Sequence, residues 1–254
     1  MILVKNVVKH FGGLVAVDGI DMNIRSGSIT GLIGPNGAGK TTLFNLIAGN
    51  IAPDEGQIFL DGEDVTGLRP HELFSKGLLR TFQISHEFHT LSVLDNLMMV
   101  PPMQIGESLM GAWFKRKEVT RQEDEIRKKA KDVISFLNLG EKTYELAGNL
   151  SGGQKKLLEL GRTMMVEPKV VILDEVGAGV NRSLLKEIGD TILSMNRDRG
   201  YTFCMIEHDM DFISRLCSPV VVMAEGKILA EGSAEEIKNN EDVLEAYLGK
   251  GSRK

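Results

Sequence analysis

Residues 34–41, with the sequence GPNGAGKT, constrain the fold of this chain more than any other stretch. They match G-x-x-x-x-G-K-[ST] without a gap, a pattern that is meaningful only between a buried strand and a helix. Residues 28–33 form a short apolar run of strand length, and residues 41–48 space their apolar side chains as in a helix. We therefore predict a phosphate-binding loop rather than a glycine-rich turn with an incidental lysine.

The residue types in this loop suit an anion. Glycines allow backbone N–H groups to curl inward without Cβ clashes, and the start of the following helix adds partial positive charge. Lys40 is long enough to reach β- and γ-phosphate oxygens, and the Thr41 hydroxyl is a suitable Mg²⁺ ligand. We expect the nucleotide to be bound by Gly34, Pro35, Asn36, Gly37, Ala38, Gly39, Lys40, Thr41 and Thr42.

Charge and hydrophobicity limit the kinds of partner. The chain has 254 residues, a net charge of -5 and 42% hydrophobic residues, which are ordinary values for a soluble globular protein. An acidic chain is poorly suited to a phosphate backbone, which argues against nucleic acid as the main partner. Basic clusters at residues 115–117 and 127–129 stand among acidic residues, so we expect them to be solvated helix faces.

The sequence indicates neither secretion nor membrane insertion. The first residues lack the layout of a signal peptide, and no uninterrupted run of about 18 apolar residues occurs. Cys204 and Cys217 have no metal-type spacing, so we expect buried, reduced thiols in a reducing compartment. Any role at a membrane is expected to come through a partner.

Hydrophobic periodicity changes twice along the chain. Residues 19–24 alternate as in a half-exposed antiparallel strand, and residues 57–62 return as another strand. Residues 119–139 have the spacing of an amphipathic helix. Fully apolar runs at 170–173 and 202–206 then alternate with helical segments, which indicates a parallel sheet with ligands at the carboxyl ends of its strands.

These changes predict one domain with an inserted part. Because the phosphate loop lies within the core, the whole chain, residues 1–254, is expected to form a single ATP-binding domain. A core with a small β layer is expected at about 1–85 and 163–248, and a mostly helical subdomain at about 86–162. Residues 249–254 are expected to be a frayed tail.

A second motif follows the apolar run at residues 170–173, where Asp174 and Glu175 stand in succession. Asp174 is placed to hold Mg²⁺ through water, and Glu175 to polarise a water molecule towards the γ-phosphorus. Four apolar residues before an acidic pair are a weak signal alone, since solvent-facing acids often end a strand. After a phosphate loop, and in this order, the signal is strong.

Two further polar residues are candidates for the same site. His208 follows the apolar run at residues 202–206, so it should reach the same sheet edge as Glu175 and contact the γ-phosphate or the attacking water. Gln83 stands where the core gives way to the helical region, and its amide is a candidate ligand of Mg²⁺ or the water. A structural histidine and a surface glutamine are the alternatives.

Residues 150–154, LSGGQ, form the last motif. Ser151 and Gln154 have the spacing of a capping box for the helix that follows. A cap does not need two glycines, however, and Gly152 and Gly153 expose N–H groups at a positively polarised helix end. A second anion-binding site is therefore predicted here, in addition to the cap.

Together, the ordered set of these motifs resembles the ATP-binding subunit of an ABC transporter, over residues 2–248. The resemblance implies an α/β fold with a RecA-like P-loop core, an antiparallel β subdomain and an inserted α-helical subdomain. It implies an ATPase with ATP and Mg²⁺, in a head-to-tail dimer. Phe11 would stack on adenine, Gln83 would act with the catalytic residues Glu175, His208 and Lys40, and Mg²⁺ would bind near Thr41, Gln83 and Asp174. Across the dimer, the nucleotide would contact Ser151, Gly152, Gly153 and Gln154.

ATPase subunits of branched-chain amino acid importers of the LivG type resemble this chain more narrowly, at residues 11–17, 80–83 and 247–249 and at the long insert around residues 98–117. This implies a second ABC ATPase chain, identical or paralogous, transmembrane permeases and indirectly a solute-binding protein, at the inner face of the cell membrane. Related importers of urea or short amides, and soluble ABC ATPases outside transport, are the alternatives. Val176 replaces the usual proline after Glu175, which predicts a less rigid turn. Residues 178–181 match the loop that crosses between the two nucleotide sites in this family, and Asn181 replaces its commoner aspartate.

Overall fold

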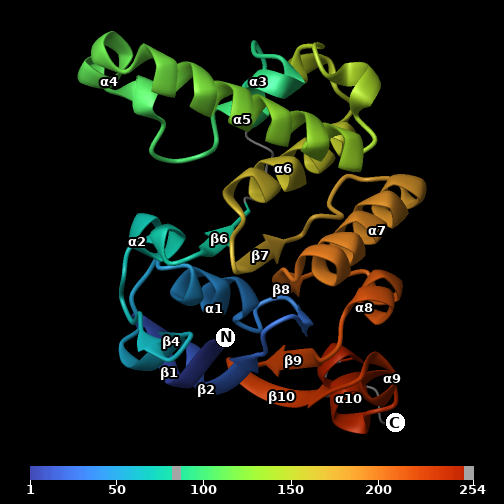
Figure 1. The fold of residues 1–254 in the computed structure, drawn as a ribbon. Helices are drawn as coiled ribbons and strands as arrows, with labels where there is room; N and C mark the ends of the chain where they lie inside the picture. Colours follow the sequence, from blue (N-terminus) through green and yellow to red (C-terminus); the bar gives the residue numbers. More distant parts are fainter. Residues whose placement is uncertain (82–86, 249–254) are drawn as a thin grey trace. The chain divides into compact units, whose positions relative to one another are not determined.

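The computed structural model describes residues 1–81 and 87–248, so Gln83 and the expected frayed tail lie outside the described residues. The chain divides into two compact units (Figure 1). The core unit contains Met1–Gln83, Pro168–Ala178 and Leu185–Lys254, and the helical unit contains Ile84–Glu167 and Gly179–Leu184. In the described part of the chain, no helix has both the length and the apolar character needed to cross a membrane.

A largely parallel sheet carries the core unit. Its strands are ordered β10-β9-β3-β8-β7-β6, and each neighbouring pair is parallel except the hairpin of β9 and β10. Every residue of β3, β7 and β8 is buried, as expected for apolar runs covered on both faces. The strands are β3 (Ile29–Ile33), β6 (Leu78–Arg80), β7 (Val170–Asp174), β8 (Thr202–Ile206), β9 (Val220–Ala224) and β10 (Lys227–Gly232).

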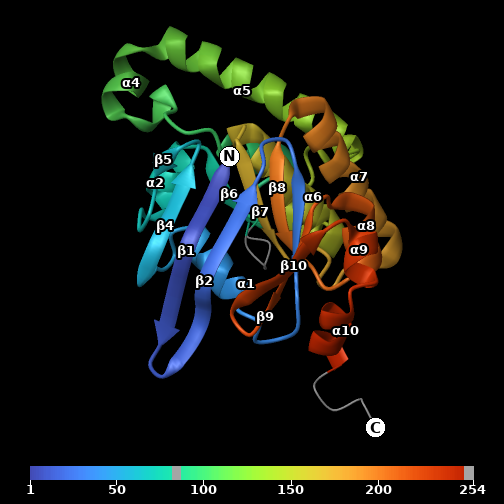
Figure 2. The same ribbon diagram turned by 90° about the horizontal axis from the view of Figure 1, so that it is seen from below.

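An antiparallel sheet forms a second layer of the core unit. Its strands are ordered β2-β1-β4-β5, and Figure 2 shows β1, β2 and β4 side by side. Buried and exposed residues alternate along the second half of β2, which fits a sheet with one face on the core. The strands are β1 (Ile2–Phe11), β2 (Leu14–Ile24), β4 (Glu55–Leu60) and β5 (Glu63–Asp64), and the short helix α2 (Pro70–Ser75) follows them.

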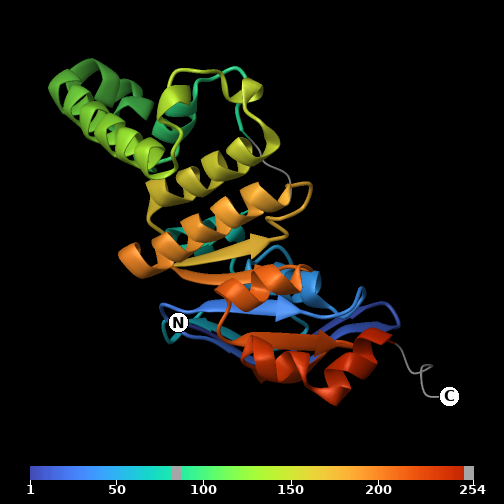
Figure 3. The ribbon, with the colours of Figure 1, turned by 90° about the vertical axis from the view of Figure 1, so that its right-hand side faces the viewer.

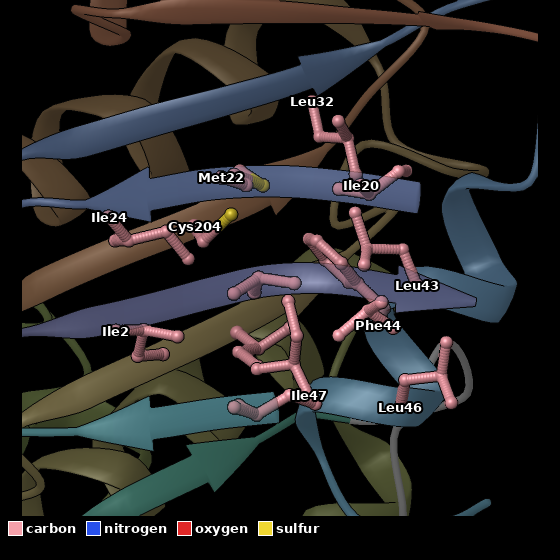
Figure 4. Packing of buried hydrophobic residues seen from close by; sticks show 14 of the residues in the cluster. Ile2, Ile20, Met22, Ile24, Leu32, Leu43, Phe44, Leu46, Ile47 and Cys204 are labelled. Carbon is pink, nitrogen blue, oxygen red and sulfur yellow. The ribbon is translucent and has the colours of Figure 1, made fainter. Parts of the chain in front are cut away.

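Helix α1 (Lys40–Ile47) joins the two layers. Its buried residues Leu43, Phe44 and Ile47 pack against Ile2 and Ile20 of the antiparallel sheet in one apolar cluster (Figure 4). Leu32 and Cys204 of the parallel sheet belong to the same cluster. Burial of this helix face therefore fixes where α1 begins, and with it the position of the loop before it.

Both cysteines are buried in the core unit. Cys204 lies on β8, and Cys217 directly follows helix α8 (Met210–Leu216). Burial raises the pKa of both thiols, that of Cys217 to about 12. The expectation of free, reduced thiols agrees with this environment.

The remaining helices of the core unit are α7 (Arg182–Arg199), which begins in the helical unit, α9 (Ala234–Lys238) and α10 (Glu241–Leu248). Figure 3 shows α9 and α10 beside the hairpin of β9 and β10, which both of them contact. The side chain of Asp209 accepts hydrogen bonds from the N–H groups of Asp211 and Phe212, and so caps α8.

The helical unit is built around α3, α5 and α6, which contact one another. Ile126, Ala130, Val133 and Ile134 form the buried stripe of α5, as the helical spacing predicts. A Cβ on Gly161 would stand 2.6 Å from the Leu137 side chain, so this glycine permits close packing of α6. The elements are α3 (Val93–Met98), η1 (Ile105–Glu107), α4 (Leu109–Phe114), α5 (Arg116–Phe136), η2 (Gly140–Lys142), η3 (Ala147–Asn149) and α6 (Gly152–Val166).

Candidate nucleotide site

Three neighbouring parallel strands deliver the motifs of the core unit to one edge of its sheet. The phosphate loop follows β3, Asp174 ends β7, and His208 comes shortly after the end of β8. Because β8 lies between β3 and β7 and is parallel to both, all three carboxyl ends meet at the same edge. The strand order therefore places these motifs together without any long-range sequence signal.

Two glycines of the phosphate loop are required by the backbone. Gly34 has a φ of 149°, and a Cβ on it would stand 2.0 Å from the Met223 carbonyl oxygen. Gly39, which caps α1 with a φ of 99°, would place a Cβ 2.3 Å from the Ala16 carbonyl oxygen. The loop is thus held tightly between β2 and the end of β9, with its N–H groups near the start of α1.

The ammonium group of Lys40 is buried in this loop. Its Nζ donates hydrogen bonds to the carbonyl oxygens of Gly34 at 2.8 Å and Pro35 at 3.0 Å. Burial lowers the pKa of Lys40, while the nearby carboxylates of Glu175 and Asp174 act in the opposite direction. The Lys40 side chain thus folds back onto its own loop. A phosphate bound in the loop could take the place of the two carbonyl oxygens as partner of the ammonium group.

Asp174 is held by an arginine that the sequence motifs did not assign a role. The Arg80 guanidinium donates to Asp174 Oδ2 at 2.7 Å and to Asn45 Oδ1 on α1 at 2.5 Å. Arg80 ends β6, the strand beside β7, so the sheet order brings it next to the carboxylate. This bridge fixes the buried Asp174 relative to the helix that carries the phosphate loop.

Glu175 and His208 come together as the strand order predicts. Glu175 Oε1 lies 3.0 Å from His208 Nε2, and the Glu175 N–H donates to the Ile206 carbonyl. Glu175 has a φ of 50°, a left-handed conformation that costs about 1–3 kcal/mol for a residue other than glycine. The side chain of Glu175 remains partly open to solvent.

A buried carboxylate next to His208 fixes this turn. Glu207 Oε1 accepts a hydrogen bond from the Gly177 N–H at 2.7 Å, and Ala178 N–H donates to the Glu175 carbonyl. Burial raises the pKa of Glu207, while the hydrogen bond from Gly177 acts against this effect. Val176 is buried where the family usually has proline, and the sequence predicted a less rigid turn there. These hydrogen bonds restrain the backbone of the turn in place of the proline ring.

Among the other predicted contacts of the core unit, Ala38 is buried and Pro35 is half-buried, and most of the rest are open to solvent. Thr41, Asn36 and Gly37 are exposed, and Thr42 is half-buried on the first turn of α1. Phe11, at the end of β1, is exposed apart from the Lys9 ammonium, which lies 5.9 Å from its ring centroid. An exposed aromatic ring with a free face is available for stacking.

The C-terminal helix also reaches the phosphate loop. Burial raises the pKa of the Tyr247 hydroxyl of α10, and the nearby backbone of Gly34 acts in the opposite direction. No chemical motif in the sequence points to this contact, because nearly the whole chain separates the two residues. Gln83, predicted to join the site, lies outside the described residues.

In the helical unit, Ser151 and Gln154 form the expected capping box at the start of α6. The Ser151 N–H donates to Gln154 Oε1 at 3.0 Å, and Gln154 N–H donates to Ser151 Oγ at 3.4 Å. A Cβ on Gly153 would lie 1.5 Å from the Leu184 side chain, so packing explains this glycine. A Cβ on Gly152 would meet nothing within 4 Å, so packing within the chain does not explain why this residue is a glycine.

A phosphate loop, a buried aspartate and a paired glutamate and histidine at one edge of a parallel sheet define the class of P-loop nucleotide hydrolases. A family model described as ABC transporter matches residues 17–178. A second, described as branched-chain amino acid ATP-binding cassette transporter, matches residues 227–252.

Proteins similar to this chain carry the same description. The probable branched-chain amino acid transport ATP-binding protein LivG of Archaeoglobus fulgidus is 40% identical, over 96% of this chain and 94% of that protein. BraF of Pseudomonas aeruginosa, a high-affinity branched-chain amino acid transport ATP-binding protein, is 36% identical, over 97% of this chain and 96% of that protein. The ADP conformation of an ATP-binding cassette of an ABC transporter superposes with a TM-score of 0.83 at 36% identity, covering 98% and 99% of the two chains.

The chain belongs to the ATP-binding cassette family of ABC transporters, whose members hydrolyse ATP to power transport. The predicted fold class, a P-loop core with an antiparallel β part and a helical part, is thereby confirmed.

Proposed function

We propose that this chain is the ATP-hydrolysing subunit of an importer of branched-chain amino acids. The relatives named LivG and BraF match it over nearly its full length, and residues 227–252 match a family model described as branched-chain amino acid ATP-binding cassette transporter. Its partners would be a second ABC ATPase chain, transmembrane permeases and, indirectly, a solute-binding protein. The chain would then work at the inner face of the cell membrane.

ATP would be held by the loop that follows β3. Backbone N–H groups at residues 36–42, at the start of α1, would attract the phosphates, and the adenine would stack on the exposed ring of Phe11. The buried Lys40 ammonium would exchange its bonds to the Gly34 and Pro35 carbonyls for the β- and γ-phosphate oxygens. This exchange keeps the positive charge partnered in both states.

The residues at this edge also suit Mg²⁺. The Thr41 hydroxyl and the Asp174 carboxylate are hard oxygen ligands of the kind Mg²⁺ prefers, and Gln83 is a further candidate. Because Asp174 Oδ2 is already bonded to Arg80, the carboxylate would act through a water molecule and its other oxygen. A bound ion would neutralise charge on the β- and γ-phosphates.

Hydrolysis would depend on Glu175 and His208. Glu175, at the mouth of the sheet edge, would accept a proton from the water that attacks the γ-phosphorus. His208 Nε2, 3.0 Å from Glu175 Oε1, would orient that carboxylate before ATP binds, and would turn its N–H to the γ-phosphate once the nucleotide is in place. Glu207 holds the turn between them and would act as a positioning residue.

A second chain would complete each site. Ser151, Gly152, Gly153 and Gln154 would cover the γ-phosphate held by the partner in a head-to-tail dimer. The open space beside Gly152 supports this role. Packing within the chain does not require a glycine at this position, whereas close approach of the partner's phosphate would. The N-terminus of α6 would supply partial positive charge to the phosphate.

The single observation that carries the mechanism is the pairing of Glu175 with His208 beside the phosphate loop. Glu175→Gln should keep ATP binding, measured by fluorescence of a nucleotide analogue, and should lower phosphate release by about 10²–10⁴-fold. The matched control is Glu187→Gln, an exposed glutamate on α7, which should keep normal turnover. Turnover of the Glu175 variant within about tenfold of the unmodified chain would refute the assignment.

A further inference from the structure

The helical unit displays an apolar surface that the nucleotide chemistry does not use. In the described residues, six large apolar side chains are at least 72% exposed, and five of them lie between residues 103 and 114. These five are Met103, Leu109, Met110, Trp113 and Phe114. Such a concentration of exposed apolar side chains marks an interaction surface.

Four of these side chains share one face of α4. Leu109 and Trp113 are four residues apart, as are Met110 and Phe114, so the four side chains span about 140° of the helix at 100° per residue. The surface is held in place: Gln122 of α5 accepts from the Ile105 N–H at 2.7 Å and donates to the Met103 carbonyl. Its apolar residues are thus presented by an ordered part of the fold.

A basic run adjoins this face. Lys115, Arg116 and Lys117 follow α4 directly and are all exposed, and Lys115 pairs with Glu118 at 3.1 Å. Within the described ranges, no ion pair engages Arg116 or Lys117. From residue 103 to residue 117 the sole acidic side chain is Glu107, although the chain as a whole carries a net charge of -5. The positive charge is therefore local to the apolar face.

We propose that α4 and the basic run, residues 103–117, bind the surface of an anionic lipid bilayer. Tryptophan and phenylalanine next to lysine and arginine are the residues that favour the boundary between headgroups and acyl chains. Basic side chains beside such a face are attracted to anionic headgroups. A second copy of this face is a poor occupant, since it would bring the same positive run against itself. This surface goes beyond the proposed ATPase function and does not depend on it.

Trp113 makes the proposal directly measurable, because it is the single tryptophan of the chain. The nucleotide-free protein is titrated with vesicles of phosphatidylcholine, with and without phosphatidylglycerol. Vesicles that contain phosphatidylglycerol should shift the tryptophan emission to shorter wavelength and carry the protein into the pellet on centrifugation. Vesicles of phosphatidylcholine alone should bind markedly less, and added salt should release the protein.

Matched variants separate a specific surface from general attraction. Arg116→Gln with Lys117→Gln should weaken binding about thirtyfold, if each basic residue contributes as is usual near an anionic surface. Arg127→Gln with Lys128→Gln changes the same charge elsewhere on α5 and should leave binding unchanged. Trp113→Ser with Phe114→Ser should abolish pelleting, whereas Tyr144→Ser, at another exposed aromatic side chain of the helical unit, should not.

Several results would overturn the proposal. These are an unchanged emission spectrum with anionic vesicles, equal binding to both kinds of vesicle, or equal losses in the two charge variants. Another is that the unmodified chain does not bind anionic vesicles while the Trp113 and Phe114 variant loses copurification with a permease, which would assign the face to a protein partner. ATP hydrolysis is measured on the same samples: normal hydrolysis without vesicle binding refutes this inference alone, and vesicle binding without hydrolysis refutes the proposed ATPase alone.

Discussion

Glu207 lies buried directly behind the edge of the sheet that carries Glu175 and His208. Burial holds its pKa above the ordinary value of 4.5. A folded-state pKa above the unfolded value means that the folded protein binds more protons in the interval between the two. Glu207 therefore costs stability progressively as the pH rises through that interval.

This sign gives a pH-dependent prediction. Glu207→Gln removes the buried charge and retains an oxygen that can accept from the Gly177 N–H. Relative to the unmodified chain, the variant should gain stability as the pH rises above 4.5, up to the folded-state pKa, and then keep a constant advantage. Urea midpoints measured over a pH series test this expectation.

Glu87 supplies the matched control with the opposite sign. Its burial alone would raise the carboxyl pKa, but the Lys155 ammonium, a backbone hydrogen bond and the charge of His89 together outweigh burial and lower the pKa. Glu87→Gln should therefore be less stable than the unmodified chain above 4.5, and the deficit should vanish on acidification through the lowered pKa. Parallel pH profiles for the two variants would contradict both assignments.

At the scale of single residues, the sequence predicts best where a motif follows a strand. Glu175 and His208 could be paired from the sequence because each follows an apolar run of strand length, and the structure places them 3.0 Å apart. Arg80, Glu207 and Tyr247 could not be assigned, because their partners lie on elements distant in sequence and no spacing links them. The left-handed backbone of Glu175 has no sequence signal either.

Among the structural elements, the start of α6 contains two adjacent glycines, and packing requires a glycine at one of the two positions only. Gly153 faces Leu184, which leaves no space for a Cβ, whereas the position of Gly152 is open. The sequence motif shows both glycines as equivalent, because packing against a distant leucine cannot be read from five residues.

The two positions should therefore respond differently to alanine. Gly153→Ala should destabilise the helical unit by about 1–3 kcal/mol through overpacking, as measured by urea unfolding. Gly152→Ala should keep full stability and, if the partner's phosphate approaches there, lower ATP turnover. The pattern is wrong if Gly152→Ala unfolds the unit or if Gly153→Ala is tolerated without loss of stability.

The start of α6 is also tied to the chain segment before α3. Lys155 Nζ lies 2.7 Å from Glu87 Oε1, and Glu87 Oε2 is buried without a hydrogen-bond partner among the described residues. Lys155→Met should leave a buried carboxylate without its main cation and cost about 3 kcal/mol of stability.

Chemical unfolding of Lys155→Met measures this loss, and the loss should shrink at acidic pH because protonation of Glu87 removes the charge. Lys142→Met is the control, since its partner Glu145 is partly open to solvent. That variant should be indistinguishable from the unmodified chain. Equal effects of the two variants would show that burial of the pair is not what matters.

Boundaries of elements followed the sequence less closely than their types. The helix expected over residues 119–139 occurs as α5 (Arg116–Phe136), and α4 lies within residues 98–117, where the apolar residues of the sequence have no clear helical period. Helix α4 is too short for periodicity to stand out, and its apolar side chains face solvent instead of a core. The strands β7 and β8 were predictable because fully buried strands are continuous apolar runs.

At the scale of the whole molecule, we expect two chains to close around ATP. The Glu175→Gln protein should elute as a dimer in size-exclusion chromatography with ATP and as a monomer without it. Adding Ser151→Arg places a bulky charge at the exposed start of α6 and should block the dimer while ATP binding persists. Ser75→Arg, at an exposed serine of α2, should dimerise normally; a dimer in the Ser151 variant would exclude the contact across chains.

The burial of Cys204 and Cys217 has a practical consequence for such experiments. Thiolate is the reactive form of cysteine, and both native thiols are enclosed with raised pKa values. Maleimide reagents should therefore leave Cys204 and Cys217 unmodified and react only with a cysteine introduced at the surface. A fluorophore at Ser75→Cys, an exposed position outside the expected dimer contact, could follow formation of the dimer in real time through its slower tumbling, with both native cysteines left in place.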